Sequence, residues 1–281
     1  MITRFAPSPT GPLHLGHAYS AITAHDMARV AGGRFLLRIE DIDRQRSKPE
    51  WETRILDDLT WLGLTWDTPP MRQSDRLHTY ASALDNLWAR GLLYPCTCTR
   101  RDIAEAMAAP QEDVTFGPDG PVYPGTCRGT GRTGPRPADR HLRLDMAKAA
   151  RHPLTFRETG TGAGEVTTTP AQYATEIGDI VLARRDFGTS YHLSVVLDDA
   201  EQGITHVVRG ADLFEATRIH VLLQHLLGLP TPAYHHHALV RDTAGKRLAK
   251  RDDARSLSSY REAGWSPEAI RSILADGLTV P

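Results

Sequence analysis

The 281-residue sequence lacks the features that mark membrane and secreted proteins. It has no run of about 18 apolar residues, which argues against a membrane-spanning helix. It begins Met1-Ile-Thr-Arg-Phe-Ala-Pro-Ser-Pro, without the charged and apolar regions of a secretory signal. Its three cysteines, Cys96, Cys98 and Cys127, are too few and too clustered for a disulfide framework. We therefore expect a cytoplasmic protein in a reducing compartment, with no membrane partner.

The sequence also has no large excess of charge of one sign, with 33 Lys and Arg against 34 Asp and Glu. This balance argues against a protein that coats nucleic acid, but two local runs are basic. Between residues 128 and 157 eight cations face two acids, and between 241 and 255 six face three. The cations are Arg128, Arg132, Arg136, Arg140, Arg143, Lys148, Arg151 and Arg157, then Arg241, Lys246, Arg247, Lys250, Arg251 and Arg255. Either run alone is compatible with a solvated surface, whereas two together favour an RNA or polyphosphate partner.

Apolar periodicity predicts an ordered succession of strands and helices in the first third of the chain. Strands are expected at 2–5 and 35–39, and helices at 15–30, 51–62 and 77–88. This order predicts an α/β fold with a parallel sheet. Residues 110–140 are rich in Gly, Pro, Thr and Arg and indicate an irregular insertion, after which regular patterns return at 179–182, 193–197 and 216–227. The internal triplet His235-His236-His237 indicates a loop or a strand edge rather than a metal site.

The segment from Arg4 to His17, Arg-Phe-Ala-Pro-Ser-Pro-Thr-Gly-Pro-Leu-His-Leu-Gly-His, lies between a predicted strand and a predicted helix. Backbone N–H groups at the start of a helix, together with its dipole, bind phosphate. Gly11 and Gly16 allow a nucleotide to approach the backbone closely. His14 and His17 are placed to hydrogen-bond phosphate oxygens. A His-x-Gly-His alone is a weak signal, but the proline-rich run before it makes coincidence improbable.

This segment resembles the "HIGH" signature of class I aminoacyl-tRNA synthetases, in the glutamyl branch. Three later segments match the same branch: Glu40-Asp41-Ile42-Asp43, Arg209-Gly-Ala-Asp-Leu213, and Arg247-Leu-Ala-Lys-Arg251 in place of the "KMSKS" loop. The resemblance extends from Ile2 to about Ser256, and the order of the motifs is more specific than any one of them. It implies a Rossmann-like parallel sheet and ATP-dependent activation of glutamate.

Only 30 residues follow Arg251, too few for the anticodon-reading domain of a full glutamyl-tRNA synthetase. A short glutamyl-type body with a Cys-x-Cys insertion resembles the glutamyl-queuosine tRNA(Asp) synthetases, which attach glutamate to queuosine at the wobble position of tRNA(Asp). We therefore expect a catalytic domain in two halves, 1–95 and 185–230. Between them, 96–184 would be an insertion with a zinc site and the acceptor-binding region. Residues 231–281 would carry the "KMSKS" loop and a short tail, with no anticodon-binding domain.

The resemblance assigns ATP binding to four residues, His14, Gly16, His17 and Lys250, and catalysis to the two histidines and the lysine. Lys250 matches the second lysine of the signature and would stabilise the triphosphate as pyrophosphate leaves. Arg247 stands where a lysine is common and keeps the charge. Ala249 stands where a serine is common, so a hydroxyl contact that orders the loop is missing. ATP would arrive with Mg²⁺ as a cosubstrate.

The resemblance also implies a glutamate pocket made of Arg4, Phe5, Ala6, Pro7, Ser8, Glu40, Tyr191 and Arg209. The chemistry agrees, because an arginine binds a carboxylate bidentately and an acid binds an ammonium group. Arg4 and Arg209 would hold the carboxylates, Glu40 the ammonium group, and Tyr191 would form one wall. Taken singly, Arg209 and Glu40 are also compatible with structural ion pairs, and Tyr191 with a core residue.

Cys96, Cys98 and Cys127 supply three thiolates, and a tetrahedral zinc site needs a fourth ligand. In the resembling family this ligand is a tyrosine four residues before the last cysteine, which matches Tyr123. His141 or a water is the conservative alternative, and three buried cysteines without metal are a further one. A single structural zinc ion would fix the insertion to the α/β body.

Three other functions are compatible with parts of the sequence. A truncated glutamyl-tRNA synthetase would charge a tRNA 3′ end, but without an anticodon domain it would read its tRNA poorly. A nucleotidyltransferase of the same superfold would adenylate a metabolite, although the glutamate-type pocket and the basic insertion argue against it. A non-catalytic tRNA-binding paralogue conflicts with an intact set of motif residues. Adenylate formation without RNA separates the last from the others, and the acceptor separates the rest.

Overall fold

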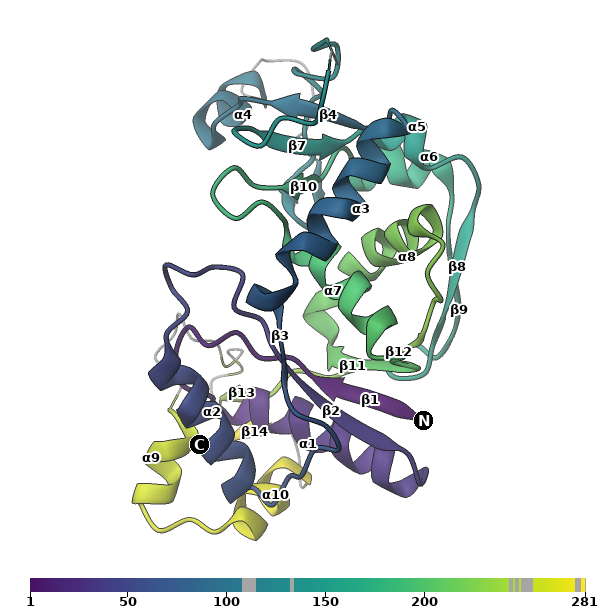
Figure 1. Ribbon diagram of the computed structural model, residues 1–281. Coiled ribbons are helices and arrows are strands. Elements are labelled where there is room, and N and C mark those ends of the chain that lie inside the picture. Colours follow the sequence, from purple (N-terminus) through teal and green to yellow (C-terminus); the bar gives the residue numbers. More distant parts are fainter. Residues whose placement is uncertain are drawn as a thin grey trace.

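The computed structural model describes residues 1–107, 115–131, 134–242, 245, 248, 255–275 and 279–280. Its N-terminal part is a parallel three-stranded sheet of β1 (Ile2–Phe5), β2 (Arg34–Ile39) and β3 (Met71–Arg72), in the order β1-β2-β3. The crossover helices are α1 (Leu15–Val30) and α2 (Pro49–Trp61) (Figure 1). The predicted parallel α/β arrangement is therefore present, and α1 has the predicted bounds.

Helix α1 packs against this sheet through small side chains. Ala18, Ala21, Ala24 and Ala28 are fully buried with Leu15, at the three- and four-residue spacing of one helix face. Strand β2 is almost entirely buried, including the guanidinium of Arg38. A charge at the centre of a buried strand requires polar partners nearby, which the site described below supplies.

A second sheet continues the first. Its order is β11-β12-β8-β9, with β11 (His206–Gly210), β12 (Ala233–His237), β8 (Leu154–Glu158) and β9 (Gly164–Thr168). The β11–β12 and β12–β8 pairs are parallel, and β8–β9 is antiparallel. Strand β11 lies beside β1, where Thr205 N–H donates to Ile2 O at 3.0 Å. Helices α7 (Tyr191–Glu201) and α8 (Ala216–Leu227) pack against each other beside this sheet.

The expectation for the histidine triplet was wrong. His235 to His237 end β12, which pairs with a strand on each side and is therefore neither a loop nor an edge. His236 is 1% exposed. Histidine occurs at such positions when its ring nitrogens have partners, and those of His236 do.

Residues between the two sheets form a third group of elements. An antiparallel sheet β10-β7-β4 contains β4 (Leu93–Cys96), β7 (His141–Leu144) and β10 (Val181–Ala183), and α3 (Leu77–Ala89) leads into it. Around it lie α4 (Arg100–Met107), a hairpin of β5 (Phe116–Gly117) and β6 (Gly120–Pro121), α5 (Met146–Ala149) and α6 (Pro170–Gln172). The described residues of 110–140 contain only the two-residue strands β5 and β6, in agreement with the irregular insertion predicted there.

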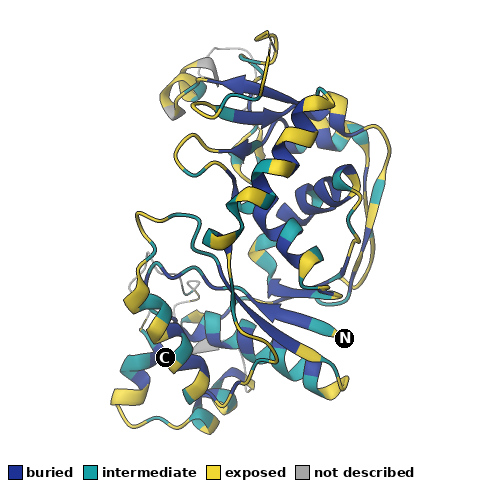
Figure 2. Ribbon diagram, viewed as in Figure 1, coloured by how far each residue is buried: buried dark blue, intermediate teal, exposed yellow. Residues whose placement is uncertain are grey.

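The C-terminal part packs beneath the first sheet. It comprises α9 (Leu257–Glu262), α10 (Pro267–Ala275) and the parallel pair of β13 (Arg241–Asp242) with β14 (Thr279–Val280). Leu257 N–H donates to Leu13 O at 2.8 Å, which ties this part to the loop before α1. Figure 2 shows buried residues along β1, β2, β11 and β12, whereas on α9 buried residues, Leu257 and Tyr260, alternate with more exposed ones. No described helix combines the length and apolar character needed to cross a membrane.

Candidate active site and cysteine cluster

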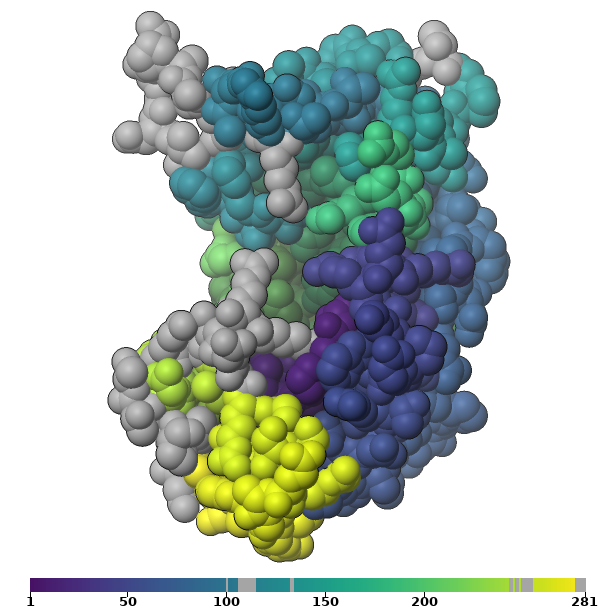
Figure 3. Space-filling view, turned by 90° about the vertical axis from the view of Figure 1, so that its left-hand side faces the viewer, coloured from purple at the N-terminus to yellow at the C-terminus, as the bar shows by residue number. Residues whose placement is uncertain are grey.

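A cavity of about 600 Å³ opens at the carboxyl ends of β1, β2, β11 and β12. In parallel α/β sheets this edge is where ligands bind. Figure 3 shows the face hollowed between the teal upper part and the yellow C-terminal helices, with purple and green segments at its floor. Nine predicted residues line the cavity: Arg4, Phe5, Ala6, His14, Gly16, His17, Glu40, Tyr191 and Arg209.

The other predicted residues have different positions. Pro7 and Ser8 do not line the cavity, but the Pro7 carbonyl accepts the N–H of Glu40 at 3.0 Å and so fixes the backbone of that acid. Gly11 is not among the lining residues either. Lys250, Arg247 and Ala249 lie outside the described residues.

The histidines of the motif cap α1. The Nδ1 atom of His14 accepts from Gly16 N–H at 3.1 Å, and Nδ1 of His17 accepts from His14 N–H at 3.2 Å. A neutral imidazole that accepts at Nδ1 carries its proton on Nε2, and this nitrogen can donate to a phosphate oxygen. A Cβ atom at Gly16 would lie 3.0 Å from the His14 ring, so any larger residue would make a tight contact with the cap.

The N–H groups expected to bind phosphate have partners within the cap. Gly16 N–H donates to His14 Nδ1 at 3.1 Å, and His17 N–H donates to His14 O at 2.9 Å. Phosphate binding by this turn stays a prediction, with the two imidazoles as further candidate donors.

Nine further residues line the cavity: Gly210, Asp212 and Leu213, which belong to the matched motif that begins at Arg209 but received no role, and Ser20, Val208, His237, Leu239, Val240 and Leu248, which sequence reasoning missed. Ser20 Oγ lies 2.7 Å from His237 Nε2. Helical spacing could have found Ser20, which follows His17 by three residues and shares its face. Most of the others lie on β11, on β12 or just after them, and only tertiary structure brings these strands beside β1.

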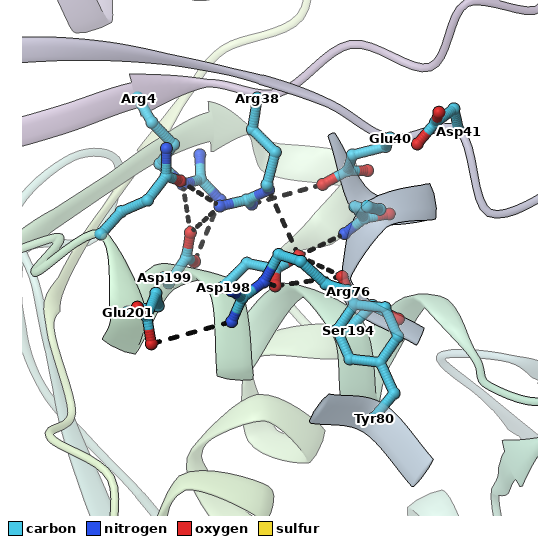
Figure 4. Close-up of polar contacts among 12 residues, drawn as sticks. Arg4, Arg38, Glu40, Asp41, Arg76, Tyr80, Ser194, Asp198, Asp199 and Glu201 are labelled. Carbon is cyan, nitrogen blue, oxygen red and sulfur yellow. Dashed lines mark hydrogen bonds and ion pairs between the residues drawn. The ribbon is translucent and has the colours of Figure 1, made fainter. Parts of the chain in front are cut away.

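Arg4 belongs to a buried network of ion pairs, shown in Figure 4. Its Nε lies 3.0 Å from Asp199 Oδ1, and the same oxygen lies 2.7 Å from Arg38 Nη1. Arg38 also reaches Glu40 at 3.3 Å, and Arg76 binds Asp198 at 2.7 Å. Three guanidinium groups thus face three carboxylates, and a fourth, the exposed Glu201, lies 3.8 Å from Arg76 at the edge of the network.

The pKa values within this network follow from its contacts. Burial alone would raise the pKa of Asp199, but Arg4 and Arg38 lower it below its ordinary value. Burial raises the pKa of Glu40, and Arg38 and Arg4 offset this only in part. A cation placed in the cavity, such as the ammonium group of an amino acid, would therefore stabilise the ionised carboxylate of Glu40.

Arg209 is held differently. Its guanidinium donates to His236 Nε2 at 3.2 Å, to His220 Nδ1 at 3.1 Å and to Thr217 Oγ1 at 2.6 Å. Arg209 itself is 6% exposed. Among the described residues no carboxylate lies within ion-pair distance of it, so its charge is available to an anion in the cavity.

Tyr191 begins α7, where Ser190 Oγ caps the helix by accepting from Leu193 N–H. Its ring lies edge-on to those of His192 and His220, and it also lines the cavity. Burial raises the pKa of its hydroxyl. Tyr191 is thus a neutral wall beside Arg209.

The three cysteines come together. Their sulfur atoms lie within 4.8 Å of one another, and Cys98 Sγ is 3.4 Å from Cys127 Sγ. The hydroxyl of Tyr123 lies 3.6 Å from Cys96 Sγ and 3.3 Å from Cys98 Sγ, and it accepts from Cys127 N–H at 2.9 Å. Three sulfurs and one phenol oxygen converge as a donor set that fits zinc. Burial opposes ionisation, yet hydrogen bonds from Tyr123 and the Thr97 backbone lower the pKa of Cys127 to about 6.

His141 is less suited to be the fourth ligand. It pairs with Cys96 across β7 and β4, but its Nδ1 accepts from Arg185 N–H at 3.2 Å. It is also absent from the described group of side chains that could share a metal. Arg143 lies over the Tyr123 ring at 3.8 Å, while burial and the three neighbouring thiols raise the pKa of the Tyr123 hydroxyl.

About half of the first basic run is engaged within the protein, Arg132 lies outside the described residues, and an RNA contact by the rest stays a prediction. Arg128 pairs with Asp179, Arg136 with Asp85 and Lys148 with Asp145. Arg143 is buried against Tyr123 and the Asp179 carbonyl. Arg140, Arg151 and Arg157 remain exposed. Most of the second run lies outside the described residues.

Comparison with known proteins identifies the family. Residues 1–279 match the family described as the catalytic domain of class I tRNA synthetases (E and Q). A glutamyl-Q tRNA(Asp) synthetase of Rhodobacter capsulatus is 65% identical over 277 residues, covering 98% of this chain and 99% of the relative. One of Nocardia farcinica is 44% identical over 278 residues, covering 99% and 85%.

Solved structures agree. A glutamate tRNA ligase from Elizabethkingia meningosepticum, in complex with its amino acid, matches 98% of this chain at a TM-score of 0.78 and 28% identity. The present chain spans 60% of the length of that ligase. The fold is thus the α/β fold of class I synthetases, which are ligases. The chain belongs to this family and, within it, to the glutamyl-Q tRNA(Asp) synthetases.

Proposed function

We propose that this protein activates glutamate with ATP and transfers it to the queuosine base at the wobble position of tRNA(Asp). The observation that carries the proposal is one cavity in which Arg209, paired with no carboxylate among the described residues, faces the same space as Glu40 and the histidines of α1. A glutamate needs a cation for its side-chain carboxylate and an anion for its ammonium group. Arg209 and Glu40 supply these two charges to the cavity. The names and the fold of the relatives support the same substrate.

In the first step an oxygen of the glutamate α-carboxylate attacks the α-phosphorus of ATP. The bond from this phosphorus to the bridging oxygen breaks, and pyrophosphate leaves with Mg²⁺ as its counter-ion. The Nε2–H groups of His14 and His17 would donate to phosphate oxygens as negative charge develops. We assign Lys250 the same task at the departing phosphates.

In the second step a hydroxyl of the queuosine cyclopentene ring attacks the carbonyl carbon of glutamyl-adenylate. An ester forms, the hydroxyl proton is released and AMP leaves. The cavity contributes mainly by holding the adenylate in one orientation and excluding water. Zinc bound by Cys96, Cys98, Tyr123 and Cys127 would keep the insertion folded and would take no part in either step.

The test is transfer of labelled glutamate, with ATP, to total tRNA from queuosine-containing and from queuosine-deficient cells. We expect label only in the first, on tRNA(Asp), in a bond as labile as an ester. Equal labelling of both would show charging of tRNA 3′ ends instead. Pyrophosphate exchange without labelling would show a different acceptor. No glutamate-dependent exchange at all would contradict glutamate activation.

A further inference from the structure

Three buried histidines link Arg209 to two carboxylates in one chain of hydrogen bonds. On one side Arg209 Nη1 meets His220 Nδ1 at 3.1 Å, and His220 Nε2 meets His192 Nδ1 at 3.0 Å. His192 Nε2 then meets Asp119 at 2.8 Å. On the other side Arg209 Nε meets His236 Nε2 at 3.2 Å, and His236 Nδ1 meets Glu158 at 2.5 Å. The chain spans β8, β12, β11, α8, α7 and the turn between β5 and β6.

The guanidinium fixes every proton in this chain, because arginine can only donate. His220 Nδ1 and His236 Nε2 must therefore be bare acceptors. The one proton of neutral His220 then lies on Nε2 and is donated to His192, whose own proton lies on Nε2 and goes to Asp119. The proton of His236 lies on Nδ1 and goes to Glu158. No other arrangement of neutral rings satisfies all five contacts.

Burial supports neutral rings at His220 and His236. His192, His220 and His236 are 6%, 2% and 1% exposed. Burial and the nearby Arg209 charge lower the pKa of His236 to about 4 and that of His220 well below its usual range. Adding a proton to either ring at the nitrogen that faces Arg209 would set two donors and two positive charges against each other.

We propose that His220 and His236 are positioning residues that hold Arg209 with neutral acceptors, so that its full charge faces a carboxylate of the substrate. This inference rests on the proposed function, in which that carboxylate belongs to glutamate. Carboxylates in direct contact would hold the arginine equally well but would offset its charge. Here Glu158 stands one imidazole further away and Asp119 two, where they set the tautomers and leave the cavity side of the arginine positive.

A matched pair of variants tests the charge of the acceptor apart from its shape. His220→Gln keeps a neutral oxygen for Arg209, whereas His220→Glu places a carboxylate of the same size there. In ATP–pyrophosphate exchange we expect KM for the substrate glutamate to be roughly 100-fold higher in His220→Glu than in His220→Gln. KM for ATP should be nearly the same in both variants. The control pair is His225→Gln and His225→Glu, an exposed position on the same helix, which should leave both constants unchanged.

Equal KM values for the two His220 variants would overturn the inference, as would equal changes for glutamate and ATP. A wild-type protein without glutamate-dependent exchange would instead overturn the proposed function. In that case, or if a variant does not fold, ¹⁵N NMR of the histidine rings in the wild-type protein decides. We expect Nε2–H at His192 and His220 and Nδ1–H at His236. A proton on the Arg209-facing nitrogen of His220 or His236 would overturn the inference by itself.

Discussion

The two arginines expected to bind substrate carboxylates line the same cavity but are held by opposite kinds of partner. Arg4 forms an ion pair with Asp199, within a network in which every arginine has a carboxylate partner. Arg209 is held by imidazoles and a threonine hydroxyl, and no described carboxylate pairs with it. A buried arginine can thus serve mainly the fold or mainly the ligand, and its hydrogen-bond partners show which. We expect loss of the Arg4 network to reduce stability first, and loss of Arg209 to reduce substrate binding first.

The largest effect on stability is expected from Asp199→Asn. This change leaves Arg4 and Arg38 without the carboxylate they share, and breaking such a buried pair costs about 3–5 kcal/mol. Urea denaturation measures the loss. The control is Glu201→Gln on the same helix, because Glu201 is 61% exposed at 3.8 Å from Arg76 and should contribute less than about 1 kcal/mol. Similar losses for the two variants would contradict the structural role of Asp199.

The largest effect on binding is expected from Arg209→Ala. Removal of a charge that no described carboxylate neutralises directly should raise KM for glutamate roughly 100-fold, with little change in KM for ATP. Pyrophosphate exchange at varied glutamate and varied ATP separates the two constants. Arg157→Ala, at an exposed position on β8, serves as the control. If both constants rose together, Arg209 would not be a glutamate-specific contact.

The histidine contacts of Arg209 and the Asp199 contacts of Arg4 should lose their contributions to stability at different pH values. The pKa of His236 is lowered from 6.5 to about 4, so the unfolded chain binds more protons between these values. Stability is therefore lost as the pH falls through this window, by on the order of 3 kcal/mol from this group. Asp199, whose pKa is lowered below 3.8, keeps its contribution until the pH falls below that value.

The measurement is the free energy of unfolding of the wild type and His236→Gln between about pH 7 and about pH 4.5. The variant should show a shallower dependence, because a glutamine does not titrate. Parallel curves would mean that other groups cause the acid sensitivity.

The smallest effect on glutamate binding is expected from the cysteine cluster, which lies outside both arginine networks. Purified wild-type protein should hold about one zinc ion per chain, and Cys98→Ser should lose it. Tyr123→Phe should retain zinc less well than the wild type, since a phenyl ring offers no donor. Metal analysis and KM for glutamate are measured on the same samples. A large rise in KM with zinc loss would show that the insertion shapes the cavity.

The sequence predicted the parts of this fold that depend on local pattern. The buried face of α1 follows from the spacing of its apolar residues, and β2 from the apolar residues between Phe35 and Ile39. Strand β8 escaped notice because only Phe156 and Glu158 are buried on it, and one of these is an acid. That acid becomes intelligible only with His236, 78 residues further along the chain.

The cavity was anticipated through motifs, and its electrostatics were not. Arg4 and Arg209 matched the same family pattern and received the same role. What separates them is contact with Asp199 in one case and with His220 and His236 in the other. The contact of Arg4 with Asp199 spans 195 residues of sequence, and those of Arg209 with His220 and His236 span 11 and 27. The last two involve histidine, whose charge near neutral pH depends on its surroundings.

The position of β1 beside β11 also affects the order in which the molecule can assemble. Asp199 is synthesised 195 residues after Arg4, an interval of about 10–40 s at ordinary rates of translation. During this time β1 can pair with β2, but its other edge and the Arg4 guanidinium await partners that do not yet exist. A nascent chain therefore displays an open strand edge, the kind of surface that chaperones protect. The walls of the cavity can be complete only after β12 has been synthesised, although the first residue that lines the cavity, Arg4, lies on the first strand.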